Sequence, residues 1–156
     1  MKPSASFTKS LLLTLFTAAL LFMAAPAAYA AGEKGAPGAP EAALPVVPSA
    51  GTKVWVGEEY YFIHEFDKNP ALGPLVLKIR LFRKDGTRTG ELAIKGSSDM
   101  PSMRGAHDTG LKAFHISKKG DYLLPVNIVM PGDWEVKILV YSGETLIFSG
   151  RILFDV

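Results

Sequence analysis

The segment YLLPVNIVMPGDWEVKILVY, residues 122–141, decides the fold class, because apolar residues stand at every second position both before and after a single turn. Apolar residues recur at every second position from Tyr122 to Met130, and again from Trp134 to Val140. A period of two is that of a β-strand with one face in a core. Pro125 has no N–H to donate to a neighbouring strand, so we expect the first strand to lie at a sheet edge or to be bulged. The segment therefore predicts two consecutive strands.

The same organisation extends through the chain after residue 51. In the segment EYYFIHEFD, residues 59–67, one face carries Tyr60, Phe62, His64 and Phe66. Further strands are predicted at residues 75–82, 91–96, 111–117 and 145–156. Short strands separated by turn signals, with no helical period between them, predict an all-β fold, an immunoglobulin-like β-sandwich of about seven strands. A small β-barrel is the alternative.

Residues 1–30 have the pattern of a secretory signal peptide. Two lysines precede an apolar run from Leu11 to Ala25, and Ala28-Tyr29-Ala30 is a cleavage site of the A-x-A type. The run could also remain as an uncleaved membrane anchor, and either outcome exports the rest of the chain. Export places the protein in the periplasm or elsewhere outside the cytoplasm.

The exported part divides into a linker and a domain. Residues 31–50 are mostly Ala, Gly, Pro and Val, which predicts a disordered or polyproline-like linker. Residues 51–156 are numerous enough to build one domain around a single core. We therefore expect a β-sandwich tethered by a flexible segment.

Composition excludes several classes of protein. Of 17 Lys and Arg residues two lie in the signal, and the other 15 balance 15 Asp and Glu residues, so nothing indicates a nucleic-acid partner. Without cysteine the chain has no disulfide and no thiolate metal site. It contains no G-x-S-x-G, H-E-x-x-H or Walker motif, and no carboxylate pair stands out. We therefore expect no enzymatic activity and no catalytic residues.

Residues 97–110, SSDMPSMRGAHDTG, are predicted as a long loop, and such loops are often functional. Met100, Met103 and His107 lie at positions i, i+3 and i+7, and Met130 ends a strand at another turn. Thioether sulfur is a soft, neutral ligand that selects Cu(I), and imidazole suits copper as well. These four residues therefore predict a metal site, with copper(I) as its cofactor.

Plainer roles remain open for the same residues. The loop could lie across the open end of the sandwich and plug its core, and Met130 could be an ordinary last residue of a strand. Trp134 is expected in the core, where its ring could also shield a metal site. His64 is expected in the core or at its rim, and His115 is at most an auxiliary ligand. The flanking Asp99 and Asp108 are expected to form turns.

These motifs resemble those of the YtkA-like and FixH-type exported domains. The chain carries three of them in the family's order, M-P-S-M at 100–103, G-D-Y at 120–122 and M-P-G-D-W at 130–134. The resemblance spans residues 57–156 and implies an immunoglobulin-like sandwich outside the cytoplasmic membrane. It also implies a role in copper handling or in the assembly of copper-containing oxidases. Family loops often place a histidine close behind the second methionine, whereas here Arg104 intervenes and brings a positive charge beside the proposed cation.

The residues and the resemblance together predict an exported Cu(I)-binding domain that delivers or sequesters copper. Its expected partner, besides the ion, is a membrane or periplasmic copper protein. The alternative is a metal-free interaction module that assists assembly of a membrane complex. In that case the loop at residues 97–110, which we call the methionine loop, is an adaptable contact surface, because Met adapts to varied partners.

The signal pattern generates the first prediction. We expect the exported protein to begin at Ala31, because cleavage follows the A-x-A site. Intact-mass measurement of protein recovered from the periplasm checks this. A mass that still includes residues 1–30 would indicate an anchor instead.

Overall fold

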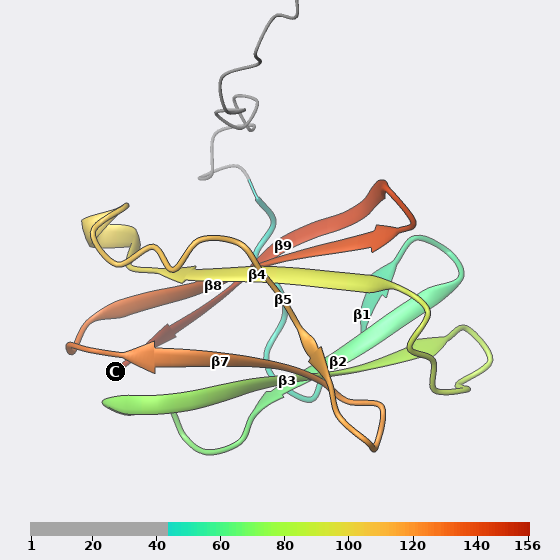
Figure 1. Ribbon diagram of the computed structural model, residues 1–156, viewed down its shortest axis with the longest axis horizontal. Coiled ribbons are helices and arrows are strands. Elements are labelled where there is room, and N and C mark those ends of the chain that lie inside the picture. The colour runs from blue at the N-terminus through green and yellow to red at the C-terminus, as the bar shows by residue number, and fades with distance from the viewer. Residues whose placement is uncertain (1–43) are drawn as a thin grey trace, which may run out of the picture. The chain divides into compact units, whose positions relative to one another are not determined.

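The computed structural model describes residues 44–156, which form nine strands in two antiparallel sheets (Figure 1). The first sheet has the order β1-β2-β3-β7-β6, made of Val54–Val56, Tyr60–Phe66, Gly73–Arg83, Tyr122–Ile128 and His115–Ile116. The second has the order β5-β4-β8-β9, made of Lys112–Ala113, Ala93–Asp99, Asp133–Ser142 and Thr145–Asp155. The predicted signal peptide and the linker up to residue 43 lie outside the described residues. Within residues 44–156 no helix has the length and apolar character needed to cross a bilayer.

The predicted sandwich is confirmed, and its strand order is that of the immunoglobulin fold. In that fold strands A, B, E and D form one sheet and C, F and G the other. Here the order β2-β3-β7-β6 faces the order β4-β8-β9, with β5 added beside β4. Figure 1 shows β4 and β8 lying above β3 and β7. The described residues contain nine strands where seven were expected. The three-residue strand β1 was not predicted, and the strand predicted at residues 111–117 is two short strands, β5 and β6.

The core lies between the sheets and follows the predicted alternation. On β3 every second side chain from Leu75 to Leu81 is fully buried, and on β8 the same holds from Trp134 to Val140. Burial of one such apolar side chain stabilises the fold by about 1.5–3 kcal/mol. His64 lies on the inward face of β2, as expected.

Pro125 occupies the kind of position that its missing N–H requires. It pairs with Val76 of β3 on one side. On the other side β6 reaches only Tyr122 and Leu123, so β7 is an edge strand at Pro125. The prediction of an edge position is therefore confirmed.

Two boundaries differ from the sequence-based expectation. β4 continues to Asp99, so the first part of the predicted loop at residues 97–110 is strand. Residues 45–50, predicted as linker, belong to the domain, because Val46 forms a parallel bridge with Arg151 on the outer edge of β9. We call residues 45–51 the strap. Sequence periodicity missed it because a single bridge leaves no alternating pattern.

Phe114 marks the point at which the chain passes from the second sheet to the first, between β5 and β6. Its ring is buried and its N–H donates to the carbonyl of Ile94 at 2.8 Å. The ring can lie there because Gly96 has no side chain. A Cβ on Gly96 would stand 2.9 Å from the Phe114 ring and 2.8 Å from the carbonyl oxygen of Lys137.

We predict that Gly96→Ala lowers the free energy of unfolding by about 1–3 kcal/mol, because overpacking displaces neighbouring atoms. Gly90→Ala is the matched control, since the nearest atoms to its new Cβ are 3.9 Å away. Urea denaturation of both variants measures the difference. Equal values for the two variants would contradict the close packing of Phe114 on β4.

Candidate metal site at the end of the sandwich

The methionine loop leaves β4 at the end of the sandwich where β8 begins (Figure 1). Pro101–Met103 form a short 3-10 turn, η2, in which the N–H of Met103 donates to the carbonyl of Met100 at 2.9 Å. The N–H of Ala106 then donates to the carbonyl of Met103 at 3.0 Å. These local bonds give the loop a defined path back towards β5.

Three carboxylates hold this loop against the outer face of the second sheet. Asp133 accepts from the backbone N–H of Ser102 at 2.9 Å and also from its hydroxyl. Glu135 binds the guanidinium of Arg104 at 2.8 Å. Asp99 accepts from the N–H of Gly105 at 2.8 Å. We call this set of contacts the carboxylate clamp.

Two of the clamp residues are buried although they lie on an outward face. Asp99 and Glu135 are paired across β4 and β8, and the loop covers both. Glu135 also lies 3.5 Å from the guanidinium of Arg151. Buried carboxylates are costly unless charges and donors surround them. The loop supplies both to Glu135 through Arg104, whereas Asp99 receives one donor from Gly105 and its Oδ1 has no hydrogen-bond partner among the described residues. Asp99 was predicted to form a turn; it is a buried strand residue instead, whereas Asp108 does form one by accepting from the N–H of Gly110 at 2.9 Å.

The clamp also alters titration at the loop. The hydroxyl of Ser102, bonded to Asp133, holds the pKa of that carboxyl below its usual value of 3.8. A lowered pKa means that this contact stabilises the fold above pH 3.8 and is lost as the pH falls through the lowered value. The contact between Asp133 and Ser102 is therefore fully formed at neutral pH.

Met100 does not lie where the sequence suggested. It was predicted to lie in the loop at residues 97–110, where it would be exposed. Instead it directly follows β4, points inward and is only 2% exposed. Its Cε methyl lies 3.0 Å from the position that a Cβ on Gly132 would occupy. Gly132 has a φ of 134°, which also favours glycine. Met100 therefore fills the core next to the β7–β8 turn, as the plugging alternative expects.

Trp134 is the side chain on which the loop and the turn meet. It is 1% exposed and lies on the inward face at the start of β8. Its indole N–H donates to the carbonyl of Met130 at 3.0 Å. The ring of His107 lies on it, with 5.9 Å between ring centroids at 42°. The expectation that Trp134 is a core aromatic is confirmed.

The four predicted ligands thus fall into two groups. Met100 and Met130 pack with the core beside Trp134, the first fully and the second partly buried. His107 lies on the same tryptophan and is partly exposed, while Met103 is 44% exposed. His115 is remote from them, because it pairs with Leu123, five residues or about 17 Å along β7 from the end that carries the loop.

Sequence reasoning missed the clamp, although each of its residues is visible in the sequence. Asp133 and Glu135 face outward on a strand whose other face is apolar, and such residues usually face water. Their partners Ser102 and Arg104 are each 31 residues away. No local signal links residues at that separation. Within residues 44–156 no group of three or more His, Asp or Glu side chains is placed to hold a metal ion.

No protein-family model matches the chain, and the comparison with curated proteins found no similar sequence. Membership of the YtkA-like and FixH-type domains therefore stays a prediction. Among solved structures the chain is similar to FetP from uropathogenic E. coli strain F11, recombinantly expressed in the periplasm of E. coli BL21(DE3). The TM-score is 0.40 and the identity 16%, over 69% of this chain and 89% of FetP. This likeness is too low to support conclusions about either protein from the other.

The clamp generates a prediction about the loop. Glu135→Gln should lower the free energy of unfolding by about 1–3 kcal/mol, because charge-assisted hydrogen bonds to a buried carboxylate are lost. It should also speed tryptic cleavage after Arg104, since the loop is less firmly held. Glu144→Gln, at the exposed β8–β9 turn, is the control and should change stability by less than about 0.5 kcal/mol. Unchanged unfolding and cleavage in Glu135→Gln would contradict the clamp.

Proposed function

We propose that the protein is an exported, non-catalytic domain that binds Cu(I) at the loop end of the sandwich. Met103, His107 and Met130 are the ligands, with Met100 beneath them at the edge of the core. The observation that carries the proposal is the meeting of the loop and the β7–β8 turn on Trp134, through the ring of His107 and the backbone carbonyl of Met130.

The donor set suits a soft monovalent ion. Thioether ligands need no deprotonation and prefer Cu(I), while a neutral imidazole binds copper as well. The ring of His107 and the backbone carbonyl of Met130 come from separate segments and both contact Trp134, which brings the two segments to the same side chain. The indole is a favourable neighbour for a cation, because its π face carries negative charge. Its burial also limits the access of water to one side of the site.

Arg104 does not oppose this proposal, although it interrupts the loop between Met103 and His107. Its guanidinium binds Glu135 on the outer face of the second sheet at 2.8 Å. Trp134 and Met100 occupy the inward side of the same strands. The positive charge is therefore balanced by a carboxylate on the face of the sheet opposite to Trp134 and Met100. Exposure of Met103 leaves a ligand that a partner protein can reach, which suits delivery of the ion.

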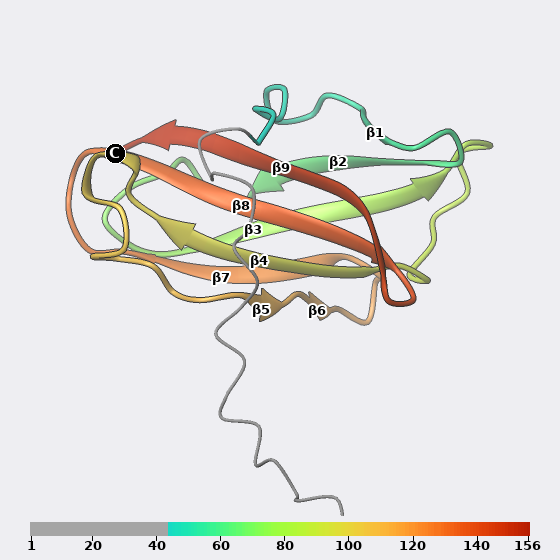
Figure 2. The same cartoon turned by 90° about the horizontal axis from the view of Figure 1, so that it is seen from above.

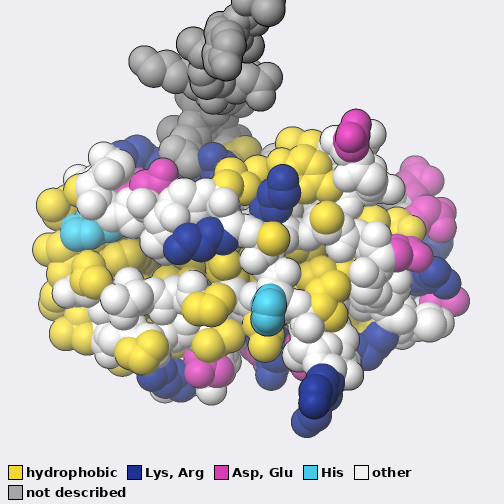
Figure 3. All heavy atoms as spheres, viewed as in Figure 1, with side chains coloured by type: hydrophobic (Ala, Val, Ile, Leu, Met, Phe, Trp, Pro, Cys, Tyr) yellow, Lys and Arg dark blue, Asp and Glu magenta, His cyan; other side chains and the backbone are white. Residues whose placement is uncertain are grey.

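A second candidate is a metal-free interaction module, and one observation favours it. Leu72 and Val129 are both more than half exposed. Leu72 precedes Gly73 and Val129 follows Ile128, and Gly73 and Ile128 are register partners at the same end of the sandwich as Met103. Figure 3 shows hydrophobic side chains gathered at this end. Exposed apolar groups beside flexible methionine suit contact with another protein. Both candidates use the same end of the domain.

Titration with Cu(I) against a chelator of known affinity separates them. We expect one Cu(I) per chain, weaker binding of Zn(II), and a loss of at least tenfold in affinity for each of Met103→Leu, Met130→Leu and His107→Gln. The leucine variants nearly conserve volume, so each should cost less than about 1.5 kcal/mol in folding.

His115→Gln is the control, because that exposed histidine lies far from the loop. Met100→Leu tests whether the buried thioether contributes to the site or only fills the core. If the wild type and a Met103→Leu, His107→Gln, Met130→Leu triple variant compete equally with the chelator, the copper proposal is wrong and the interaction module replaces it.

A further inference from the structure

The strap closes the edge of the sandwich between β9 and β2, at a distance from the methionine loop. The backbone of Arg151 on β9 bonds to it twice, donating to the carbonyl of Pro45 at 2.9 Å and accepting from the N–H of Val47 at 2.8 Å. On β2, the carbonyl of His64 accepts from the N–H of Gly51 at 3.0 Å. Figure 2 shows this segment, in blue-green, beside β9 and β2. The strap thus joins one sheet to the other.

A buried imidazole makes the fourth contact of the strap. Nε2 of His64 lies 2.8 Å from the carbonyl oxygen of Pro48, and a carbonyl can only accept, so Nε2 carries the proton. The side chain is 2% exposed. Nδ1 has no hydrogen-bond partner among the described residues and therefore presents an unused lone pair. The neutral ring donates the hydrogen bond that the Pro48 carbonyl accepts. If Nδ1 were also protonated, its N–H would have no hydrogen-bond acceptor.

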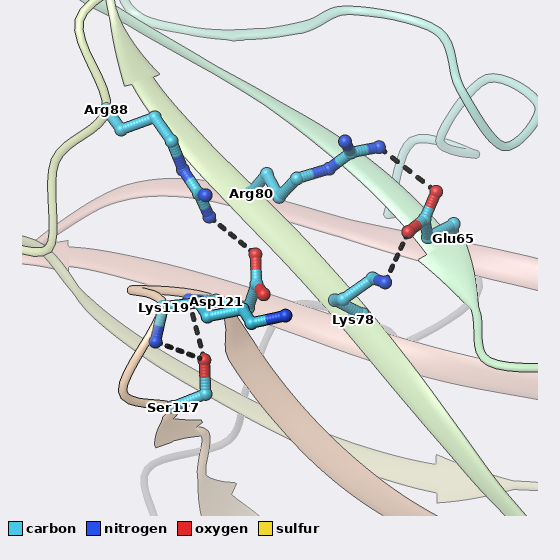
Figure 4. A network of polar contacts seen from close by, with 7 residues as sticks. All are labelled: Glu65, Lys78, Arg80, Arg88, Ser117, Lys119 and Asp121. Carbon is cyan, nitrogen blue, oxygen red and sulfur yellow. Dashed lines mark hydrogen bonds and ion pairs between the residues drawn. The ribbon is translucent and has the colours of Figure 1, made fainter.

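Among residues 44–156, none that lines the surroundings of His64 carries a charge that could stabilise an imidazolium. A pocket of about 420 Å³ lies between the strap, β2 and β9, and its lining is apolar apart from Ser49 and His64 itself, including Val47, Phe66, Ile152 and Phe154. On β3, the register partner of His64 is the apolar residue Ile79. The nearest carboxylate along β2, Glu65, lies on the opposite face, where it binds Lys78 and Arg80 (Figure 4).

We propose that His64 is a proton-operated latch whose protonation releases the strap from β2 and β9. A proton taken up from solvent at Nδ1 would place both a charge and an unpaired donor in an apolar pocket. The ring can satisfy them only by turning towards water, which breaks the bond to Pro48. The remaining polar contacts of the strap are three backbone hydrogen bonds, and the side chain of Val47 is buried against the core. Both kinds of contact are lost when the strap opens.

The direction of the pH dependence follows from burial. Burial lowers the pKa of His64 from 6.5, and the bond to Pro48 offsets this only in part. The closed strap therefore binds fewer protons than the open one in the range between 6.5 and the lowered pKa. The closed state is fully favoured above about pH 6.5. Between about pH 6.5 and the lowered pKa of His64, the population of the open state increases about tenfold for each unit that the pH falls.

Release of the strap changes two properties of the domain. The backbone N–H and C=O of Arg151 become free on the edge of β9, which can then accept an extended peptide as an added strand. The tether also gains the seven residues 45–51, or at most about 25 Å of reach. The strap bonds to the backbone of Arg151, whose guanidinium lies 3.5 Å from Glu135 of the carboxylate clamp. None of the four strap contacts includes a proposed copper ligand, so the latch can be tested in the absence of copper.

Hydrogen exchange of the full exported chain, followed by NMR from pH 7.5 to pH 5 and corrected for intrinsic exchange rates, tests the latch. Protection of the amides of Val47, Gly51 and Arg151 should fall about tenfold per pH unit below 6.5. The amide of Phe114, bonded within the core, should keep its protection. An equal fall at Phe114 means global unfolding and would overturn the proposal, as would unchanged protection of the strap.

Two variants sharpen the test. In His64→Gln the side-chain amide can still donate to Pro48 but does not titrate, so the strap should remain protected at pH 5. His115→Gln, at an exposed histidine, should behave like the wild type. If His64→Gln fails to fold, the ring resonances of His64 in the wild type decide instead. They must titrate over the pH range in which the strap opens, and a ring that stays neutral while the strap opens would refute the latch.

Discussion

The placement of Trp134 at one end of the core is the constraint on which the loop end of the sandwich depends. An indole buried between two sheets needs an acceptor for its N–H, and the carbonyl of Met130 is that acceptor. This bond fixes the β7–β8 turn. The β7–β8 turn requires glycine at position 132, because the Met100 side chain occupies the space that a Cβ would need. The loop then returns over the same ring through His107. One aromatic side chain thus organises residues from the β7–β8 turn and from the methionine loop.

The carboxylate clamp explains why the loop lies so close to the sheet in spite of its glycine and proline content. Asp133, Glu135 and Asp99 line the outer face of β4 and β8, and each binds a different group of the loop. A carboxylate on an outward strand face would normally be solvated. Covering it with the loop exchanges water for charged or backbone donors, and this exchange favours a single loop path. The proposed ligands therefore rest on a scaffold that is polar outside and apolar inside.

We propose two features of the domain that respond to different chemical conditions, one at the loop end of the sandwich and one at its β9–β2 edge. The methionine and histidine side chains gather at the end of the sandwich, where soft ligands meet a buried aromatic ring. The strap lies along the β9–β2 edge, where His64 holds it in an apolar pocket. In the two proposals a soft cation would act on the first and a proton on the second. Export would expose both to the environment outside the cytoplasm, whose composition a cell controls less tightly.

The sequence by itself determined the fold class, because period-two alternation is a local property that any stretch from Tyr122 to Tyr141 displays. It also determined which residues face the core on β3 and β8, and that Pro125 lies at an edge. Only the tertiary structure decided that Met100 points inward, that Arg104 turns to Glu135, and that residues 45–51 belong to the domain. These facts depend on strand register and on contacts between residues far apart in the chain. Alternation reports which face a residue occupies, but not which distant segment covers that face.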